Sequence, residues 1–191
     1  SPRRAGPARR RRDEWSDIVS VEEVDFLIVG AGIAGASAGY YLAPHAKVVV
    51  LERESQPGYH STGRSAALYS ETYGNFTVRA LTVASGPFFA RPPEGFTDHP
   101  LVSPRGALVF GNQAQAAKLD AMYADWIKLV DTVQRLDREQ TLALCPLLNP
   151  GSVAGSVFEP DARDTDVHAT PKRFLRGLRA NGVRLRGDSD A

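Results

Sequence analysis

The stretch "VDFLIVGAGIAGASAGYYLAPHAKVVVLE" at residues 24–52 decides the fold that we expect. It contains an apolar run at 26–29, a glycine-rich turn at 30–35, a helix of small residues up to about Leu42, and a second apolar run at 48–51. This order predicts a β-α-β unit. Strands that are apolar on both faces belong to a parallel sheet covered by helices, so we expect an α/β fold.

Three glycines in the turn indicate a phosphate-binding backbone. Gly30, Gly32 and Gly35 fill the pattern G-x-G-x-x-G between strand and helix. The first glycine allows a tight turn, the second lets a pyrophosphate approach the backbone, and the third lets the helix pack against the strand. The N-terminus of the helix adds free N–H groups and a partial positive charge. The pattern alone also occurs in ordinary loops, so its context matters.

Glu52 supplies that context, because it ends the second apolar run twenty residues after Gly32. An acid at this place can accept hydrogen bonds from both ribose hydroxyls of an adenosine, whereas the alternative is a surface acid at a strand end. A carboxylate also repels a 2′-phosphate. The spacing therefore predicts an adenine dinucleotide other than NADP.

The polar segment "STGRSA" at 61–66 favours FAD over NAD as that dinucleotide. It offers consecutive backbone N–H groups, hydroxyl side chains and one guanidinium, which suit a second contact with a pyrophosphate and a flavin ring. The alternative is a flexible loop in which Arg64 is merely solvated.

The rest of the sequence predicts short helices alternating with short strands. We expect helices at 76–89, 112–130 and 138–145 and strands at 106–111, 132–137 and 151–160. The acids of "DARDTD" at 161–166 predict a solvated turn, followed by a helix with Thr170 as N-cap, Pro171 in its first turn, and Asn181-Gly182 as its stop. "VRLR" at 183–186 begins a strand for which the sequence offers no partner, so we expect the N-terminal part of a longer protein.

Three segments carry a resemblance to a known family: "DFLIVGAGIAGASAGYYLA", "VVVLERESQPGYHSTGRSAALY" and "VRALTVASGPFF". Together they resemble the D-amino-acid oxidase-like (DAO) family of FAD-dependent oxidoreductases, and within it the D-arginine and other D-amino-acid dehydrogenases. The resemblance implies a Rossmann-like FAD/NAD(P)-binding domain of the glutathione-reductase type with an inserted α+β substrate domain, incomplete at its C-terminus. The implied division is an Arg-rich disordered tail at 1–22, the FAD-binding domain at 23–95 and 157–191, and part of the substrate domain at 96–156.

The resemblance also implies a reaction and a set of site residues. FAD would accept a hydride from the Cα of a D-amino acid or related amine, and the resulting imine would hydrolyse to a 2-oxo acid and ammonia. The electron acceptor, quinone or oxygen, stays open. Tyr73 either lies near the substrate or is a half-buried packing tyrosine. The implied cofactor-binding residues are Gly30, Gly32, Ile33, Ala34, Gly35, Glu52, Arg53, Ser61, Thr62, Gly63, Arg64, Ser65, Ala66 and Ala67.

Two departures from the family pattern bear on the substrate. Leu68 stands where similar enzymes have a histidine, and leucine cannot replace an imidazole in hydrogen bonding or proton transfer. Gly106 and Ala107 stand where enzymes for cationic substrates have an acid. We therefore expect a substrate less basic than D-arginine, or an altered activity. An NAD-binding dehydrogenase and a non-catalytic dinucleotide-binding remnant remain as alternatives.

Composition excludes several other classes of protein. The formal net charge is +1, which gives no reason to expect nucleic acid as a partner. There is no run of about 20 apolar residues and no secretory signal, and the four histidines show no metal-ligand spacing, so we expect neither a transmembrane segment nor a metal site.

Cysteine content and the arginine-rich start bear on location. Cys145 is the only cysteine, which excludes an internal disulfide and fits a reducing compartment. Six of the first twelve residues are Arg, a composition typical of a disordered extension. We expect a cytoplasmic protein, with a targeting role or a peripheral attachment to an anionic membrane as alternatives for the tail.

Overall fold

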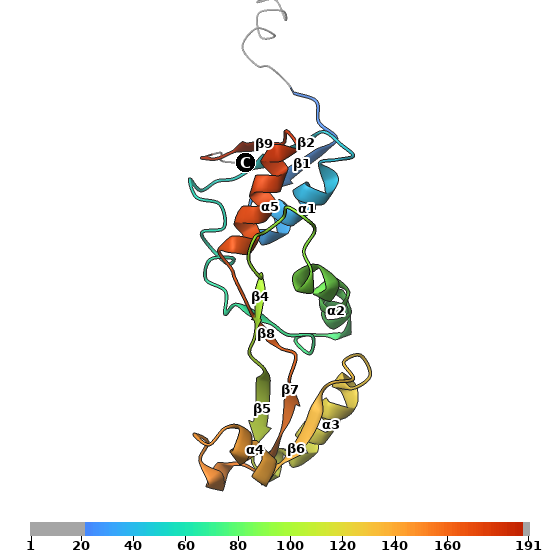
Figure 1. Cartoon of the computed structure of the whole chain (residues 1–191), viewed down its shortest axis with the longest axis vertical. Coiled ribbons are helices and arrows are strands. Elements are labelled where there is room, and N and C mark those ends of the chain that lie inside the picture. Colours follow the sequence, from blue (N-terminus) through green and yellow to red (C-terminus); the bar gives the residue numbers. More distant parts are fainter. Residues whose placement is uncertain (1–21, 189–191) are drawn as a thin grey trace, which may run out of the picture.

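The computed structural model describes residues 22–188, so that nearly all of the expected tail at 1–22 lies outside the described residues. These residues form an elongated molecule in which three small sheets follow one another along the long axis (Figure 1). The order of helices and strands along the chain agrees with the α/β pattern predicted from the sequence.

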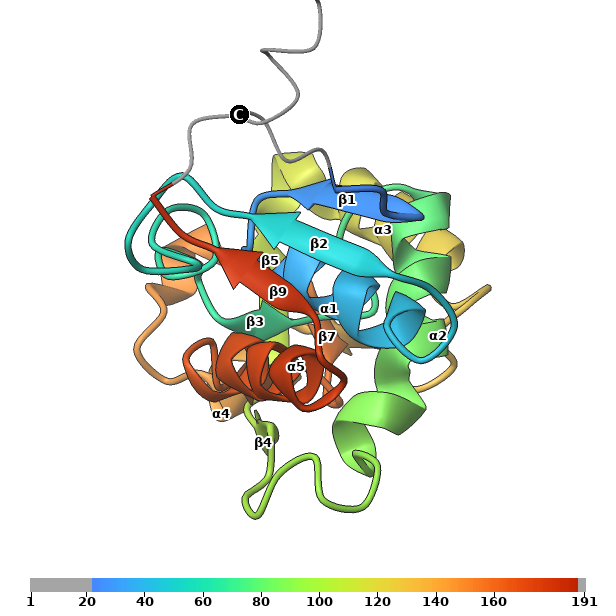
Figure 2. The ribbon, with the colours of Figure 1, turned by 90° about the horizontal axis from the view of Figure 1, so that it is seen from above.

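The first sheet is parallel and contains the predicted β-α-β unit. Its strands are β1 (Phe26–Val29), β2 (Val48–Leu51) and β9 (Arg184–Arg186), in the order β1-β2-β9. Helices α1 (Ile33–Leu42) and α5 (Ala169–Ala180) lie together against one face of this sheet, as Figure 2 shows. The core between sheet and helices is apolar and includes Val48, Val50, Ala36, Phe174 and Leu178.

Strand β1 differs from the expectation that both faces of the sheet are covered. It is an edge strand, and the side chains of Leu27 and Val29 are 56% and 68% exposed. Strand β9 pairs in parallel with β2, with Leu185 opposite Val50. The expectation that the strand at 183–186 has no partner was therefore wrong, because a partner distant in sequence is available.

The second sheet is antiparallel and joins segments far apart in the chain. Its central strand β8 (Arg163–Thr165) pairs with β3 (Leu68–Tyr69) on one side and with β4 (Val102–Pro104) on the other. The segment at 161–166 was predicted to be a solvated turn. That prediction was wrong because two flanking strands, which supply the backbone hydrogen bonds, lie about 60 and 95 residues earlier in the chain.

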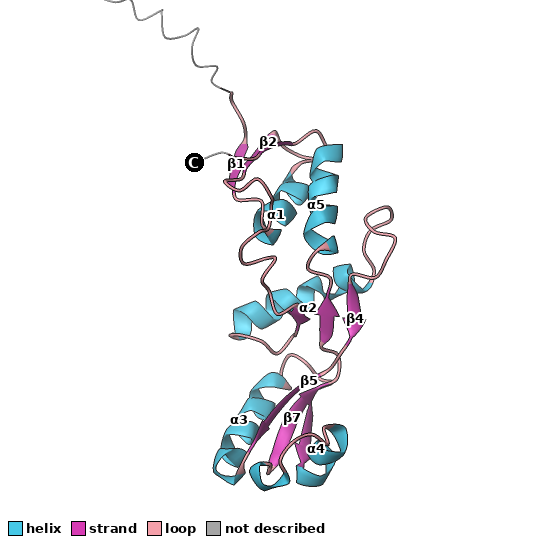
Figure 3. Ribbon diagram, turned by 90° about the vertical axis from the view of Figure 1, so that its left-hand side faces the viewer, coloured by secondary structure: helices cyan, strands magenta, loops and turns pink. Residues whose placement is uncertain are grey.

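The third sheet is also antiparallel and has the order β5-β7-β6. The strands are β5 (Ala107–Gly111), β6 (Gln134–Asp137) and β7 (Gly155–Glu159), and the packed helices are α3 (Ala116–Trp126) and α4 (Arg138–Leu144). Figure 3 shows both helices beside this sheet at the end of the molecule far from β1.

Short 3₁₀ turns at Gln113–Gln115 and Pro150–Ser152 connect elements of this sheet. Helix α2 (Phe76–Ala90) lies beside the second sheet. All of these elements except the 3₁₀ turns and the short strands β3, β4 and β8 were predicted from the sequence, with boundaries that differ by a few residues.

Helix α5 begins at Ala169, and its N-cap position is His168 and not Thr170 as predicted. The carboxylate of Asp166 explains the difference, because its Oδ1 accepts hydrogen bonds from the backbone N–H groups of His168 (3.0 Å) and Ala169 (2.7 Å). An aspartate that satisfies the first N–H groups fixes the start of a helix. The stop at Asn181 and Gly182 was predicted correctly, and Gly182 has a φ of +75°.

Helices α1 and α5 approach closely through two glycines. A Cβ at Gly39 would lie 2.8 Å from Leu178 Cδ2, and a Cβ at Gly177 would collide with the ring of Tyr40. The Tyr40 ring has little freedom to move, since its centroid lies 5.6 Å from that of Phe96 and 5.4 Å from that of Phe174. The pairing of these helices therefore depends on the absence of side chains at 39 and 177.

We predict that Gly177→Ala lowers the free energy of unfolding by up to about 2 kcal/mol, measured by urea denaturation. Alanine favours a helix by about 1 kcal/mol over glycine, but overpacking against a fixed ring costs about 1–3 kcal/mol. The control is Arg179→Ala on the exposed side of α5, which should change the stability by less than about 0.5 kcal/mol. A variant as stable as the wild type would show that the Tyr40 ring can move aside.

Candidate functional site

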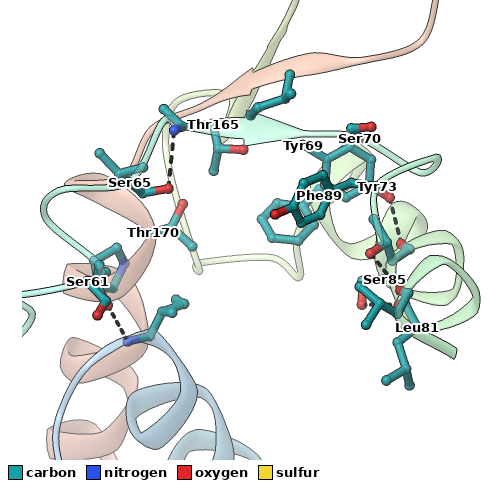
Figure 4. A pocket seen from close by; sticks show the side chains of 18 residues that line it. Ser61, Ser65, Tyr69, Ser70, Tyr73, Leu81, Ser85, Phe89, Thr165 and Thr170 are labelled. Carbon is teal, nitrogen blue, oxygen red and sulfur yellow. Dashed lines mark hydrogen bonds between the residues drawn. The ribbon is translucent and has the colours of Figure 1, made fainter. Parts of the chain in front are cut away.

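A cavity of about 540 Å³ lies where the first sheet meets the second. Its walls come from the N-terminus of α1, the polar segment before β3, helix α2 and the start of α5 (Figure 4). The described residues that line it are all uncharged: Ile33, Ser61, Thr62, Ser65, Ala67, Leu68, Tyr69, Ser70, Tyr73, Val78, Leu81, Thr82, Ser85, Phe89, Thr165, Val167, Thr170 and Pro171.

The glycine turn borders the cavity through Ile33. Gly30 has a φ of +95°, a conformation that favours glycine, and its N–H donates to the carbonyl of Leu51 at 2.7 Å. A Cβ at Gly35 would collide with the carbonyl oxygen of Gly30, so the helix can pack on the turn only with glycine there. The two glycines thus act as the sequence predicts, in the turn and in helix packing.

Glu52 is 8% exposed and closes the turn from the strand side. Its Oε2 accepts a hydrogen bond from the N–H of Ala31 at 2.7 Å, and its Oε1 accepts one from the N–H of Glu54 at 3.0 Å. A carboxylate oxygen has more than one lone pair, so both oxygens can accept a further donor such as a ribose hydroxyl. Arg53 points away into solvent, where it pairs with Glu54 at 3.4 Å.

The polar segment folds back onto the start of α1. Thr62 Oγ1 accepts a hydrogen bond from the N–H of Ile33 at 3.1 Å. Backbone hydrogen bonds from Gly63 to Gly58 (2.8 Å) and from Arg64 to His60 (3.1 Å) shape the turns within the segment. These hydrogen bonds give the segment a defined path in the structure, and most of its residues, Arg64 among them, are exposed.

The side chains of Arg64 and His60, both in the loop, are engaged locally. The guanidinium of Arg64 lies 5.3 Å from the centroid of the Tyr59 ring, a cation–π distance, and it does not line the cavity. The His60 ring lies 2.8 Å from Glu54 Oε1, and this hydrogen bond is the main cause that lowers the pKa of Glu54, although burial opposes it.

Residue 67 carries local backbone strain at the cavity wall. Ala67 has a φ of +59°, in the left-handed region that costs roughly 1 kcal/mol for a residue with a Cβ. Its N–H donates to Ser65 Oγ at 3.2 Å, and its carbonyl accepts from the N–H of Thr165 at 2.6 Å. These two bonds, one local and one to strand β8, hold the strained residue in place.

The structure divides the residues predicted for the site into three groups. Six of them line the cavity: Ile33, Ser61, Thr62, Ser65, Ala67 and Tyr73. A second group surrounds the adjacent glycine turn: Gly30, Gly32, Ala34, Gly35 and Glu52. The others lie on the connection outside the cavity lining: Arg53, Gly63, Arg64 and Ala66.

The two departures from the family pattern have different places. Leu68 lines the cavity, so its apolar side chain belongs to the wall. Neither Gly106 nor Ala107 lines the cavity. Gly106 has a φ of +77°, and a Cβ there would lie 3.0 Å from the Phe158 ring, which explains the glycine by backbone conformation and packing.

Glu159, at the end of β7, holds residues 70–72 beside the cavity and was missed by the sequence analysis. It is 1% exposed, and its Oε2 accepts hydrogen bonds from Ser70 Oγ (2.7 Å) and Thr72 Oγ1 (2.6 Å). Its Oε1 accepts one from the N–H of Glu71 at 2.6 Å. The partners lie 87–89 residues earlier in the chain, so no local pattern could have revealed them.

Tyr69, which lines the cavity, adds a second polar link. Its hydroxyl oxygen lies 2.7 Å from the carbonyl oxygen of Thr82 and 3.0 Å from Glu71 Oε1. Burial raises the pKa of Tyr69, and the charge of Glu71 raises it further. The phenol therefore stays protonated and donates a hydrogen bond that ties strand β3 to helix α2.

A comparison with known families places the chain in one of them. The DAO family, described as FAD dependent oxidoreductase, matches residues 25–191. The chain belongs to this family. FAD is the family's cofactor, which favours FAD over NAD as the dinucleotide predicted from the glycine turn and Glu52.

Solved structures share the α/β fold of this DAO-family chain. L-α-glycerophosphate oxidase from Mycoplasma pneumoniae, solved with FAD bound, superposes with a TM-score of 0.76 at 17% sequence identity over 89% of this chain. Glycine oxidase from Geobacillus kaustophilus gives 0.75 at 19% over 87%, and L-proline dehydrogenase from P. horikoshii gives 0.72 at 17% over 86%. The alignments cover 46%, 47% and 44% of those proteins, so the chain spans less than half of their lengths.

Two further properties concern residues 22–188 alone. No helix in this range is long and apolar enough to cross a bilayer. Within the same range, no group of three or more His, Cys, Asp or Glu side chains has the geometry to hold a metal ion.

We predict that Glu159→Gln lowers the free energy of unfolding by about 2–3 kcal/mol, measured by chemical denaturation. Glutamine would place an amide NH₂ group, which is a donor, where a carboxylate oxygen of Glu159 accepts, so that two donors would face each other. The lost hydrogen bonds to a charged group are worth about 1.5–3 kcal/mol each. The control is Glu94→Gln on the surface, with an expected change below about 0.5 kcal/mol. Equal stability of the two variants would contradict the anchoring role.

Proposed function

We propose that this chain contributes the dinucleotide-binding half of an FAD-dependent oxidoreductase that oxidises the Cα–N bond of a D-amino acid or a related amine. The observation that carries the proposal is the continuity of the site. The glycine turn with Glu52 leads through Ile33 and Thr62 directly into an uncharged cavity of about 540 Å³.

The residues present fit FAD at both ends of that site. At the glycine turn, the helix N-terminus and the free lone pairs of Glu52 suit a pyrophosphate and an adenosine ribose. In the cavity, Ser61, Thr62 and Ser65 offer hydroxyl groups beside apolar walls, a combination that suits a flavin ring with its polar edge. The other loop residues implied by the family resemblance, Arg53 and 63–67, belong to the same proposal.

When bound, FAD would serve as the hydride acceptor for the substrate Cα, and the imine that remains would hydrolyse to a 2-oxo acid and ammonia. The chain's own residues supply placement. Val78, Leu81 and Phe89 offer the substrate an apolar wall, and the phenol of Tyr73, which is 74% exposed, lies on the same wall and can offer it a hydrogen bond.

The lining of the cavity supports a substrate without a positive side chain. None of the described lining residues carries a charge, so these residues offer a guanidinium no ion pair, and a neutral side chain suits them better. Leu68 adds an apolar surface where similar enzymes have a histidine. We therefore propose a D-amino acid or amine whose side chain is apolar or neutral, in place of D-arginine.

The domain division is part of this proposal. Residues 23–95 and 157–191 would form the FAD-binding domain, and residues 96–156 would contribute to the substrate domain. The arrangement that supports it is the separation of the parallel sheet β1-β2-β9 from the antiparallel sheet β5-β7-β6. Because β7 is the central strand of that antiparallel sheet and runs to Glu159, the boundary belongs after Glu159 and not after residue 156.

A test of the cofactor uses the complete protein and the variant Glu52→Gln. The wild type should be yellow and release FAD on denaturation. Glu52→Gln should weaken FAD binding about tenfold, measured by flavin fluorescence titration, because one hydrogen bond to a charged acceptor is lost. Glu94→Gln is the matched control and should bind FAD as the wild type does. A colourless wild type that takes up no FAD would instead favour a non-catalytic remnant.

A test of the substrate contact uses Tyr73→Phe. We predict a fall of about tenfold in kcat/KM for an apolar D-amino acid, with unchanged FAD affinity, because only the phenol hydroxyl is removed. Assays with oxygen and with a quinone as acceptor apply to each variant. Tyr41→Phe on the outside of α1 is the control and should match the wild type. The alternative of a half-buried packing tyrosine was wrong, because Tyr73 is 74% exposed. An unchanged kcat/KM in Tyr73→Phe would contradict a contact between its hydroxyl and the substrate.

A further inference from the structure

Thr170 has a buried hydroxyl that the described part of the chain leaves without a hydrogen-bond partner. The residue is 2% exposed, and its Oγ1 is one of three buried side-chain atoms of residues 22–188 without a partner. The other two belong to Arg79, whose Nη2 pairs with Asp125 away from the cavity. A buried hydroxyl without a partner is unfavourable, so such an atom calls for an explanation.

The helix to which Thr170 belongs does not use this hydroxyl. Asp166 satisfies the first turn of α5 alone, because its carboxylate accepts from the N–H groups of His168 and Ala169 and its carbonyl accepts from the N–H of Thr170 at 3.0 Å. The next residue, Pro171, has no N–H. The Thr170 side chain is therefore available for another purpose.

The place of the hydroxyl indicates that purpose. Thr170 lines the cavity, together with Ser61, Thr62 and Ser65 of the polar loop. In Figure 4 its hydroxyl oxygen carries no dashed line and points toward Ser65, another residue of the cavity wall. The apolar wall that holds Tyr73 belongs to helix α2 and the segment before it.

We propose that Thr170 is a cofactor-binding residue, whose hydroxyl forms a hydrogen bond with the flavin or ribityl part of FAD in the cavity. This inference rests on the proposed function. A hydroxyl can donate to a carbonyl oxygen or a ring nitrogen and can accept from a ribityl hydroxyl, and the flavin part of FAD offers all three kinds of group. The cofactor then supplies the partner that the protein lacks.

Thr170→Val should affect the stability of the protein and its affinity for FAD in opposite directions. Thr170→Val keeps the shape of the side chain and removes only the hydroxyl. In the protein stripped of FAD, the variant should be at least as stable as the wild type, because an unpartnered polar atom is removed. In the same preparation, FAD should bind about tenfold more weakly, as measured by quenching of flavin fluorescence.

A second buried threonine provides the matched control. The Oγ1 of Thr141 lies 2.5 Å from the carbonyl oxygen of Asp137 and 2.8 Å from Ser156 Oγ, and the residue does not line the cavity. Thr141→Val should lower the melting temperature of the FAD-free protein and leave FAD affinity unchanged. Thr170→Ser keeps the hydroxyl and should retain FAD affinity within about twofold of the wild type.

The outcomes separate this inference from the proposed function. A complete wild-type protein that takes up no FAD defeats the proposed function itself. If the wild type binds FAD and Thr170→Val binds it equally well, the proposed function stands and the role of Thr170 is wrong. A fall in the melting temperature of FAD-free Thr170→Val, as in Thr141→Val, would likewise overturn the inference, since it would show that water or the chain already satisfies the hydroxyl.

Discussion

The contact between Gly35 and the carbonyl of Gly30 is the constraint on which the arrangement of the site depends. Because no Cβ can fit there, helix α1 packs directly on the turn that follows β1. That position directs the N-terminus of α1 toward the cavity and presents Gly39 to α5. Helix α5 then approaches closely enough for its first turn to reach the cavity wall. One close backbone contact thus brings residues 33 and 170 to the same space.

Much of this arrangement is accessible from the sequence, because it is encoded by local patterns. The β-α-β unit and the glycine turn combine short-range periodicity with one spacing of twenty residues. Both strands were predicted with the correct bounds, whereas the helix begins at Ile33, inside the turn predicted at 30–35. The long helices were also predicted, since their apolar residues recur at helical spacing. The stop of α5 follows from a glycine at positive φ.

The parts that sequence analysis missed depend on partners distant in the chain. Strand β8 exists because two other segments pair with it, and Glu159 is buried because hydroxyls 87 and 89 residues away reach it. The error at Thr170 is of another kind. Thr170 and Asp166 are both good capping residues, and only the backbone path after β8 decides that Asp166 takes this role.

Because the hydroxyl of Thr170 has no partner in the described part of the chain, the stability of the empty protein and the affinity for the cofactor place opposite demands on this position. Laboratory evolution that selects only for heat resistance of the empty chain would favour apolar residues at position 170, because they remove a polar atom that the fold does not need. Selection for tight loading of the cofactor would retain the hydroxyl. The identity of this side chain in engineered variants would thus record which of the two demands was applied.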